Sequence, residues 1–133
     1  MKKLLSIFIS ILFLVGCAVP VEQEISYRQI TMDEAVAMME EEEGYIILDV
    51  RTAAEFDEKH IPGAINIPNE TIGAEVIPEL PDKDQLILVY CRSGNRSKQA
   101  SEKLVKLGYT NVVEFGGIID WTGETETNEG GPL

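Results

Sequence analysis

The residues best suited to chemistry lie in the segment CRSGNRS, which runs from Cys91 to Ser97. It follows the apolar run LILVY, residues 86–90, and precedes a segment with the apolar spacing of a helix. A loop between a strand and a helix can point several backbone N–H groups at one spot, where the helix N-terminus adds partial positive charge. Such a loop stabilises anions, and the thiolate of Cys91 is an anion. The segment therefore predicts a nucleophilic cysteine in an anion-binding loop.

The neighbours of Cys91 are not core residues. The six that follow it are polar, charged or glycine: Arg92, Ser93, Gly94, Asn95, Arg96 and Ser97. Gly94 allows a turn with positive φ, and Ser97 can cap the following helix through its hydroxyl. The alternative is an inert cysteine that packs as a small hydrophobe, and these polar neighbours argue against it.

The only other cysteine, Cys17, ends an N-terminal segment of a different kind. Lys2 and Lys3 precede an apolar stretch from Leu4 to Val15, which is shorter than the roughly 20 residues of a membrane span. Residues 1–16 therefore predict a signal peptide. The ending LVGC resembles a bacterial lipobox, which implies an exported lipoprotein anchored to a membrane through lipid on Cys17. Residues 18–25 then form most of a tether, 17–25, and Cys91 is the only free thiol.

Length and charge narrow the classes of function. The 133 residues suffice for one domain of ordinary size, and the net charge is −12. A strongly acidic chain lacks the basic surface that nucleic-acid binding requires. An anionic substrate would need a local basic site, such as the two arginines that follow Cys91.

The rest of the chain alternates between strand and helix signals. Capping boxes at Thr31/Glu34 and Thr52/Glu55 mark two helix starts. Apolar runs and periodic segments predict strands over 26–30, 45–50, 63–68, 86–90 and 111–115, and helices after residues 31 and 52 and over 69–78 and 97–107. This alternation predicts an α/β fold with an open parallel sheet and helices on both faces. Ligands of such sheets bind beyond the carboxyl ends of the strands, where Cys91 lies.

Four segments in order resemble the rhodanese-like sulfurtransferases: LDVR from Leu48, EFDEKHIPGAINIP from Glu55, CRSGNRS from Cys91, and EFGGIIDW from Glu114. The resemblance implies a rhodanese-like domain over 26–121, with a five-stranded parallel sheet flanked by helices. Residues 122–133 are then a polar tail, which we expect to fray. The implied reaction moves sulfane sulfur from thiosulfate or a persulfide donor onto the cysteine, and then to a thiol or cyanide.

Carried onto this sequence, the resemblance makes Cys91 the nucleophile and persulfide carrier. It implies that the backbone amides of residues 92–97 surround the outer sulfur, and that Arg92 and Arg96 hold the anionic donor. Asp49 and Arg51 either brace the loop or form a structural ion pair. His60 is expected to be structural, and neither a cofactor nor a metal is implied.

Two other readings stay open. Phosphatases and arsenate reductases of the related fold resemble Cys-x5-Arg loops, whereas Cys91 to Arg96 is Cys-x4-Arg, and the shorter loop suits one sulfur atom better than a phosphate. The chain could also be a sulfur carrier or a redox-sensing binding module, although it keeps the cysteine and both arginines. We favour sulfur transfer over both.

Overall fold

The structure, a computed structural model, describes residue 16 and residues 26–73 and 75–128. Its elements, in chain order, are β1 (Arg28–Gln29), α1 (Met32–Glu41), β2 (Ile46–Asp49), α2 (Ala53–Glu58), β3 (Ile65–Asn66), the 3-10 turn η1 (Asn69–Thr71), β4 (Ile87–Cys91), α3 (Asn95–Lys106), β5 (Val112–Gly117) and the 3-10 turn η2 (Ile118–Asp120). Five strands form one sheet in the order β1-β5-β4-β2-β3. Every neighbouring pair is parallel. The prediction of a five-stranded parallel α/β fold is confirmed.

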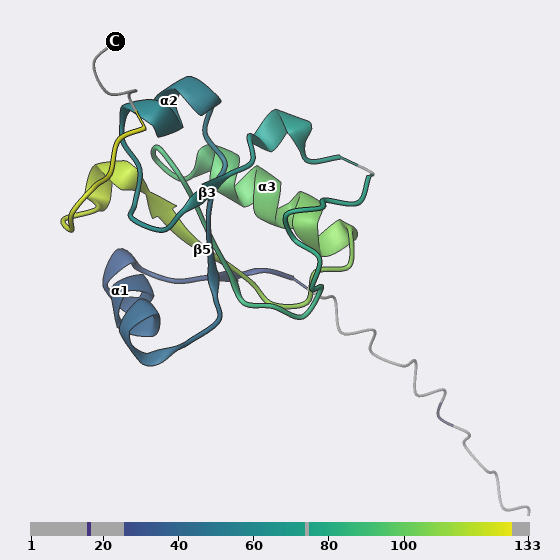
Figure 1. The fold of residues 1–133 in the computed structure, drawn as a ribbon. Helices are drawn as coiled ribbons and strands as arrows, with labels where there is room; N and C mark the ends of the chain where they lie inside the picture. The colour runs from purple at the N-terminus through teal and green to yellow at the C-terminus, as the bar shows by residue number, and fades with distance from the viewer. Residues whose placement is uncertain (1–15, 17–25, 74, 129–133) are drawn as a thin grey trace, which may run out of the picture.

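The sheet has a core on each face, because its central strands are apolar on both sides. β4 is buried along its whole length, as expected for a parallel strand covered twice. Leu48, Val89 and Leu104 belong to the core cluster that includes α3, whereas Ala35 and Leu88 belong to the cluster that includes α1. Figure 1 accordingly shows α1 and α3 on opposite sides of the sheet. The outer strands β1 and β3 are only two residues long.

Both predicted capping boxes are present. Thr31 accepts a hydrogen bond from Glu34 N at 3.1 Å, and Thr31 N donates to the Glu34 carboxylate at 2.9 Å. Thr52 and Glu55 make the same reciprocal pair at the start of α2. These contacts satisfy backbone N–H groups that a helix start leaves without partners, and they fix where α1 and α2 begin.

The predicted helix over 69–78 is wrong. Within residues 69–73 and 75–78 the structure has only the turn η1, which the Thr71 hydroxyl closes by donating to Pro68 O at 2.7 Å. Gly73 and Pro78 interrupt any regular helix here, because glycine and proline are the two poorest helix formers.

The predicted fraying of the C-terminal tail is wrong for residues 122–128. His60 N donates to Glu126 O at 2.8 Å, and Glu126 N donates back to His60 O at 2.9 Å. Asn128 N also donates to Asp57 O at 2.9 Å. The segment is therefore tied along α2 by backbone hydrogen bonds that the polar composition of the tail does not reveal.

The predicted signal peptide, the lipid on Cys17 and the tether fall in residues 1–25, of which the structure describes only Gly16. They stay predictions, as does any structure of residues 129–133. Over residues 26–73 and 75–128, no helix has the length and apolar character that crossing a membrane requires.

Candidate active site

Cys91 is the last residue of β4 and lies at the carboxyl edge of the sheet. The neighbouring strand β2 ends at the same level, because Asp49 pairs in register with Tyr90. The side chain of Cys91 is almost fully buried, with 1% of the residue exposed. Only residues 92–94 separate Cys91 from α3, so the sulfur lies close to the N-terminus of a twelve-residue helix. Figure 1 labels α3, the helix that follows this loop.

The loop presents a backbone amide to the sulfur. Gly94 N donates a hydrogen bond to Cys91 Sγ at 3.0 Å. Gly94 has φ +116°, a conformation that residues with a Cβ rarely adopt, so glycine is needed for the turn that brings this amide to the sulfur. Arg92, Ser93 and Asn95 are exposed. That their backbone amides help to surround the outer sulfur stays a prediction.

Ser97 is not the helix cap that the sequence suggests. α3 begins two residues earlier, at Asn95, and the capping position belongs to Gly94, whose missing side chain leaves no side-chain cap. Ser97 is instead fully buried under the loop, where its Oγ lies 3.4 Å from Cys91 Sγ and 2.9 Å from Gly94 O. The hydroxyl therefore contacts the reactive sulfur itself.

Glu114 is a part of the site to which the sequence analysis assigned no role. It lies on β5, between β1 and β4, and is 3% exposed. Its Oε1 accepts a hydrogen bond from the Ser97 hydroxyl at 2.6 Å and another from Gly116 N at 2.8 Å. Glu114 is a charged residue within the otherwise apolar run VVEFGG, and this was the signal that its side chain has a specific hydrogen-bonding partner.

The backbone of Gly117 supports the start of the loop, a role that the sequence alone did not indicate. A Cβ on Gly117 would overlap the carbonyl of Arg92 and the amide nitrogen of Ser93. The register of β4 against β5 shifts at this point, pairing Cys91 with Gly117, and Ile119 N donates to Arg92 O at 3.2 Å. The start of the loop therefore lies directly on the backbone of Gly117.

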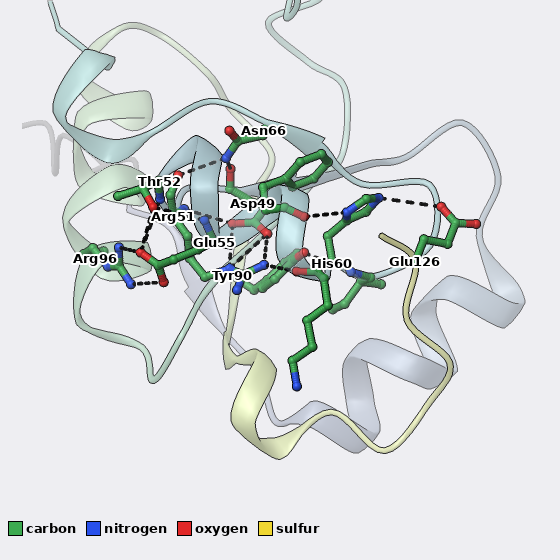
Figure 2. A network of polar contacts seen from close by, with 12 residues as sticks. Asp49, Arg51, Thr52, Glu55, His60, Asn66, Tyr90, Arg96 and Glu126 are labelled. Carbon is green, nitrogen blue, oxygen red and sulfur yellow. Dashed lines mark hydrogen bonds and ion pairs between the residues drawn. The ribbon is translucent and has the colours of Figure 1, made fainter. Parts of the chain in front are cut away.

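Arg96 is paired with α2. Its Nη1 and Nη2 donate to the two carboxylate oxygens of Glu55 at 2.7 and 2.9 Å, a bidentate geometry that Figure 2 shows. The hydrogen bond from Arg96 lowers the pKa of Glu55 from 4.5 to about 2, and the same pairing raises the pKa of Arg96. Arg96, which the resemblance assigns to the anionic donor, is therefore already paired with Glu55. The same ion pair anchors α3 to α2.

Replacement of Glu55 by glutamine tests this ion pair. Because the pKa of Glu55 is lowered in the folded state, the pair stabilises the fold above the ordinary value near 4.5 and loses that effect as the pH falls toward 2. Glutamine keeps the capping box, so E55Q removes mainly the charge. We expect E55Q to unfold about 1 kcal/mol more easily at neutral pH, since both side chains are about 30% exposed.

Urea titrations at neutral pH and at successively lower pH measure the difference. It should shrink between about pH 4.5 and pH 2. Glu58→Gln on the same helix is the matched control, because no described cation pairs with Glu58. An E55Q deficit that is independent of pH would contradict the ionic role.

Asp49 and Arg51 form a buried ion pair at the end of β2. Arg51 Nη2 lies 2.6 Å from Asp49 Oδ2 and also donates to Lys59 O at 2.7 Å. Asn66 Nδ2 donates to the carbonyls of Asp49 and Arg51, at 3.0 and 2.9 Å. Figure 2 shows this network between β2, α2 and β3. Its hydrogen bonds are those of a structural ion pair that fixes the start and the end of α2, which borders the site.

His60 connects α2 to the C-terminal segment. Its Nδ1 lies 2.8 Å from Phe56 O, its ring stacks on Phe56 at 3.8 Å, and its Nε2 lies 3.6 Å from Glu126 (Figure 2). These contacts are the ones a packed structural histidine makes.

A cavity of about 460 Å³ opens beside the loop, a volume within the range of small-molecule sites. It is lined by Arg51, Glu55, Glu58, Lys59, Arg92, Ile118 and Ile119. Among the described residues, Arg92 and Lys59 have no carboxylate partner, so these two cations are available to an anion that enters. In the same part of the chain, histidine, cysteine and acidic side chains form no group of three that could hold a metal ion.

Comparison with known proteins agrees with this geometry. Residues 31–124 match the family described as Rhodanese-like domain. The chain is 40% identical over 73 residues to "Thiosulfate sulfurtransferase PspE" of Escherichia coli (strain K12), covering 55% of this chain and 70% of that protein. It is 34% identical over 96 residues to "Thiosulfate sulfurtransferase GlpE" of Pseudomonas savastanoi pv. phaseolicola, covering 71% of this chain and 87% of that protein.

A solved structure described as "rhodanese with anions from E. coli" has the same fold. It shares 35% identity and a TM-score of 0.57, with 62% of this chain and 98% of that one covered. The chain therefore belongs to the rhodanese-like domain family, as its four sequence segments predict.

Proposed function

We propose that this chain is a sulfurtransferase that carries sulfane sulfur as a persulfide on Cys91. The observation that carries the proposal is the position of Sγ, which accepts a hydrogen bond from Gly94 N at 3.0 Å beside the N-terminus of α3. Backbone amides and a helix N-terminus stabilise negative charge on sulfur. Relatives named as thiosulfate sulfurtransferases, among them PspE and GlpE, support the same activity.

The reaction has two steps with one covalent intermediate. The Cys91 thiolate attacks the outer sulfur of thiosulfate, a new S–S bond forms, and the old S–S bond breaks with its electron pair leaving on sulfite. The Cys91 persulfide anion then gives its outer sulfur to a thiolate or cyanide acceptor, which regenerates the Cys91 thiolate. No net oxidation or reduction occurs across the two steps.

Arg92 is the arginine we assign to the sulfur donor. Its side chain is exposed and lines the cavity with Lys59, whereas Arg96 is held by Glu55. Two unpaired cations suit a dianion such as thiosulfate, and they supply the local basic site that a chain of net charge −12 requires. Ile118 and Ile119 form an apolar wall of the same cavity, against which the carbon atoms of a thiol acceptor can pack.

Mass spectrometry of the reduced full-length chain after thiosulfate treatment tests the proposal. One sulfur, about 32 mass units, should be added to the peptide that contains Cys91, and cyanide should remove it. Cys17→Ser is the control, because it removes the other cysteine and should load equally well. Absence of added sulfur, or its presence on Cys17 alone, would reject the proposal. Loading that neither cyanide nor a thiol reverses would reject the transfer step.

A further inference from the structure

The Ser97 hydroxyl lies between the reactive sulfur and a buried carboxylate. Its Oγ is 3.4 Å from Cys91 Sγ on one side and 2.6 Å from Glu114 Oε1 on the other. All three residues are buried, with 1%, 0% and 3% of their surface exposed. The sulfur and the carboxylate are thus joined by one hydroxyl group in a part of the protein that water scarcely reaches.

The Glu114 carboxylate has no cation to balance it among the described residues. Two donors serve its Oε1, namely the Ser97 hydroxyl and Gly116 N. Burial of a charged carboxylate is costly even with hydrogen bonds, and a second negative charge on the nearby sulfur would add repulsion. A single proton that moves between sulfur and carboxylate avoids both charges being present together.

The hydrogen-bonding capacity of the three groups permits this movement. A serine hydroxyl has one proton to donate and two lone pairs that accept. When Cys91 is a thiol, Sγ–H donates to Oγ, and the Ser97 hydroxyl donates to the Glu114 carboxylate. When the sulfur is an anion, a protonated Glu114 donates to Oγ, and Ser97 donates to the sulfur. Gly94 N and Gly116 N donate to Sγ and Oε1 in both states, and Gly94 O, 2.9 Å from Oγ, keeps a hydrogen bond from Lys98 N at 3.3 Å.

We propose that Glu114 is a positioning residue that accepts the proton of Cys91 through Ser97 and holds it while the sulfur is an anion. The inference rests on the proposed function, because it describes what happens to the proton when Cys91 is loaded. The thiol, the Glu114 carboxylate and thiosulfate become the Cys91 persulfide anion, the Glu114 carboxylic acid and sulfite. Transfer of the outer sulfur to an acceptor thiolate leaves the Cys91 thiolate, and the proton returns to it through Ser97.

The other ionisable groups around Glu114 do not offer a competing route. Gln29 of β1 and Val89 of β4 are its strand neighbours, and neither titrates. Tyr27 precedes β1, and its pKa is raised by burial and by the carboxylates of Glu102 and Glu114. Tyr27 therefore stays protonated when the sulfur is loaded, which leaves Cys91 as the partner with which Glu114 exchanges a proton.

The number of protons released during loading tests the relay. The reduced chain is mixed with thiosulfate in weak buffer near pH 6, a pH indicator counts protons, and mass spectrometry of the same sample counts loaded sulfur. Addition of sulfite alone corrects for the proton that sulfite takes up. We expect the wild type to release close to none per sulfur loaded, and Glu114→Gln to release about one, because an amide cannot accept the thiol proton.

Glu102→Gln is the matched control, since Glu102 is exposed on α3 and should behave as the wild type does. Release of about one proton by the wild type would overturn the relay, and so would equal release by the wild type and E114Q. Ser97→Ala, which removes the hydroxyl between Cys91 and Glu114, should likewise release about one proton and decides the matter if E114Q does not fold, because a wild-type Cys91 that rests as a thiolate would also release none. A sample without added sulfur instead rejects the proposed function, so the two failures are distinguishable.

Discussion

Replacement of Cys91 by serine abolishes sulfur loading, and we expect turnover of thiosulfate and cyanide to fall by at least about 10³-fold. A serine hydroxyl stays protonated near neutral pH, and its oxygen forms no persulfide. The substitution exchanges two side chains of similar shape at the end of β4, where Gly94 N can donate to oxygen as it does to sulfur. The loss should therefore be chemical, with little change in fold.

Two measurements check this expectation for Cys91→Ser. Intact mass after thiosulfate treatment reports loading, and thermal unfolding reports whether the fold is retained. The Cys17→Ser variant should load as the wild type does, because Cys17 precedes the domain. Turnover by C91S at the wild-type rate would show that sulfur travels by another route.

Replacement of Gly117 by alanine should displace the loop that holds the sulfur. The new methyl group would overlap the backbone of Arg92 and Ser93, which cannot move aside as a flexible side chain can. We expect a loss of about 1–3 kcal/mol in the free energy of unfolding, the usual range for overpacking a core. The rate of sulfur loading should fall at least about 100-fold, because small displacements of reacting groups have effects of that size.

Mass spectrometry of samples quenched at successive times measures the rate of sulfur loading by Gly117→Ala. Urea unfolding measures its free energy of unfolding. Gly73→Ala is the matched control, since an added methyl group there has no atom within 4 Å and the backbone is not strained. Loading by G117A at the rate of G73A would contradict the support that we assign to Gly117.

Features encoded within a few residues of one another could be read from the sequence. The capping boxes at Thr31 and Thr52 each depend on residues three apart, and both are present. The anion-binding loop after β4 and the positive φ of Gly94 follow from one strand, one turn and one helix. The parallel sheet could be predicted because strands and helices alternate along the chain, and this alternation does not depend on how distant side chains pack.

Features that depend on how distant segments meet could not be read in this way. Arg96 pairs with Glu55, which is 41 residues away, so the sequence alone left its charge available for a substrate. The contact of Ser97 with Glu114 requires the packing of α3 on β5, and an error of two residues in the helix start gave Ser97 a capping role. The support from Gly117 depends on a shift of strand register, for which the residue pattern has no signal.

The short outer strands of the sheet have a consequence for behaviour at high concentration. A long, unpaired strand edge offers rows of backbone donors and acceptors onto which another chain can add its own strand. β1 and β3 are each only two residues long, which is too few to hold a strand from another chain in register. The short edges therefore disfavour the addition of strands from other chains, a step by which folded domains form fibrillar aggregates.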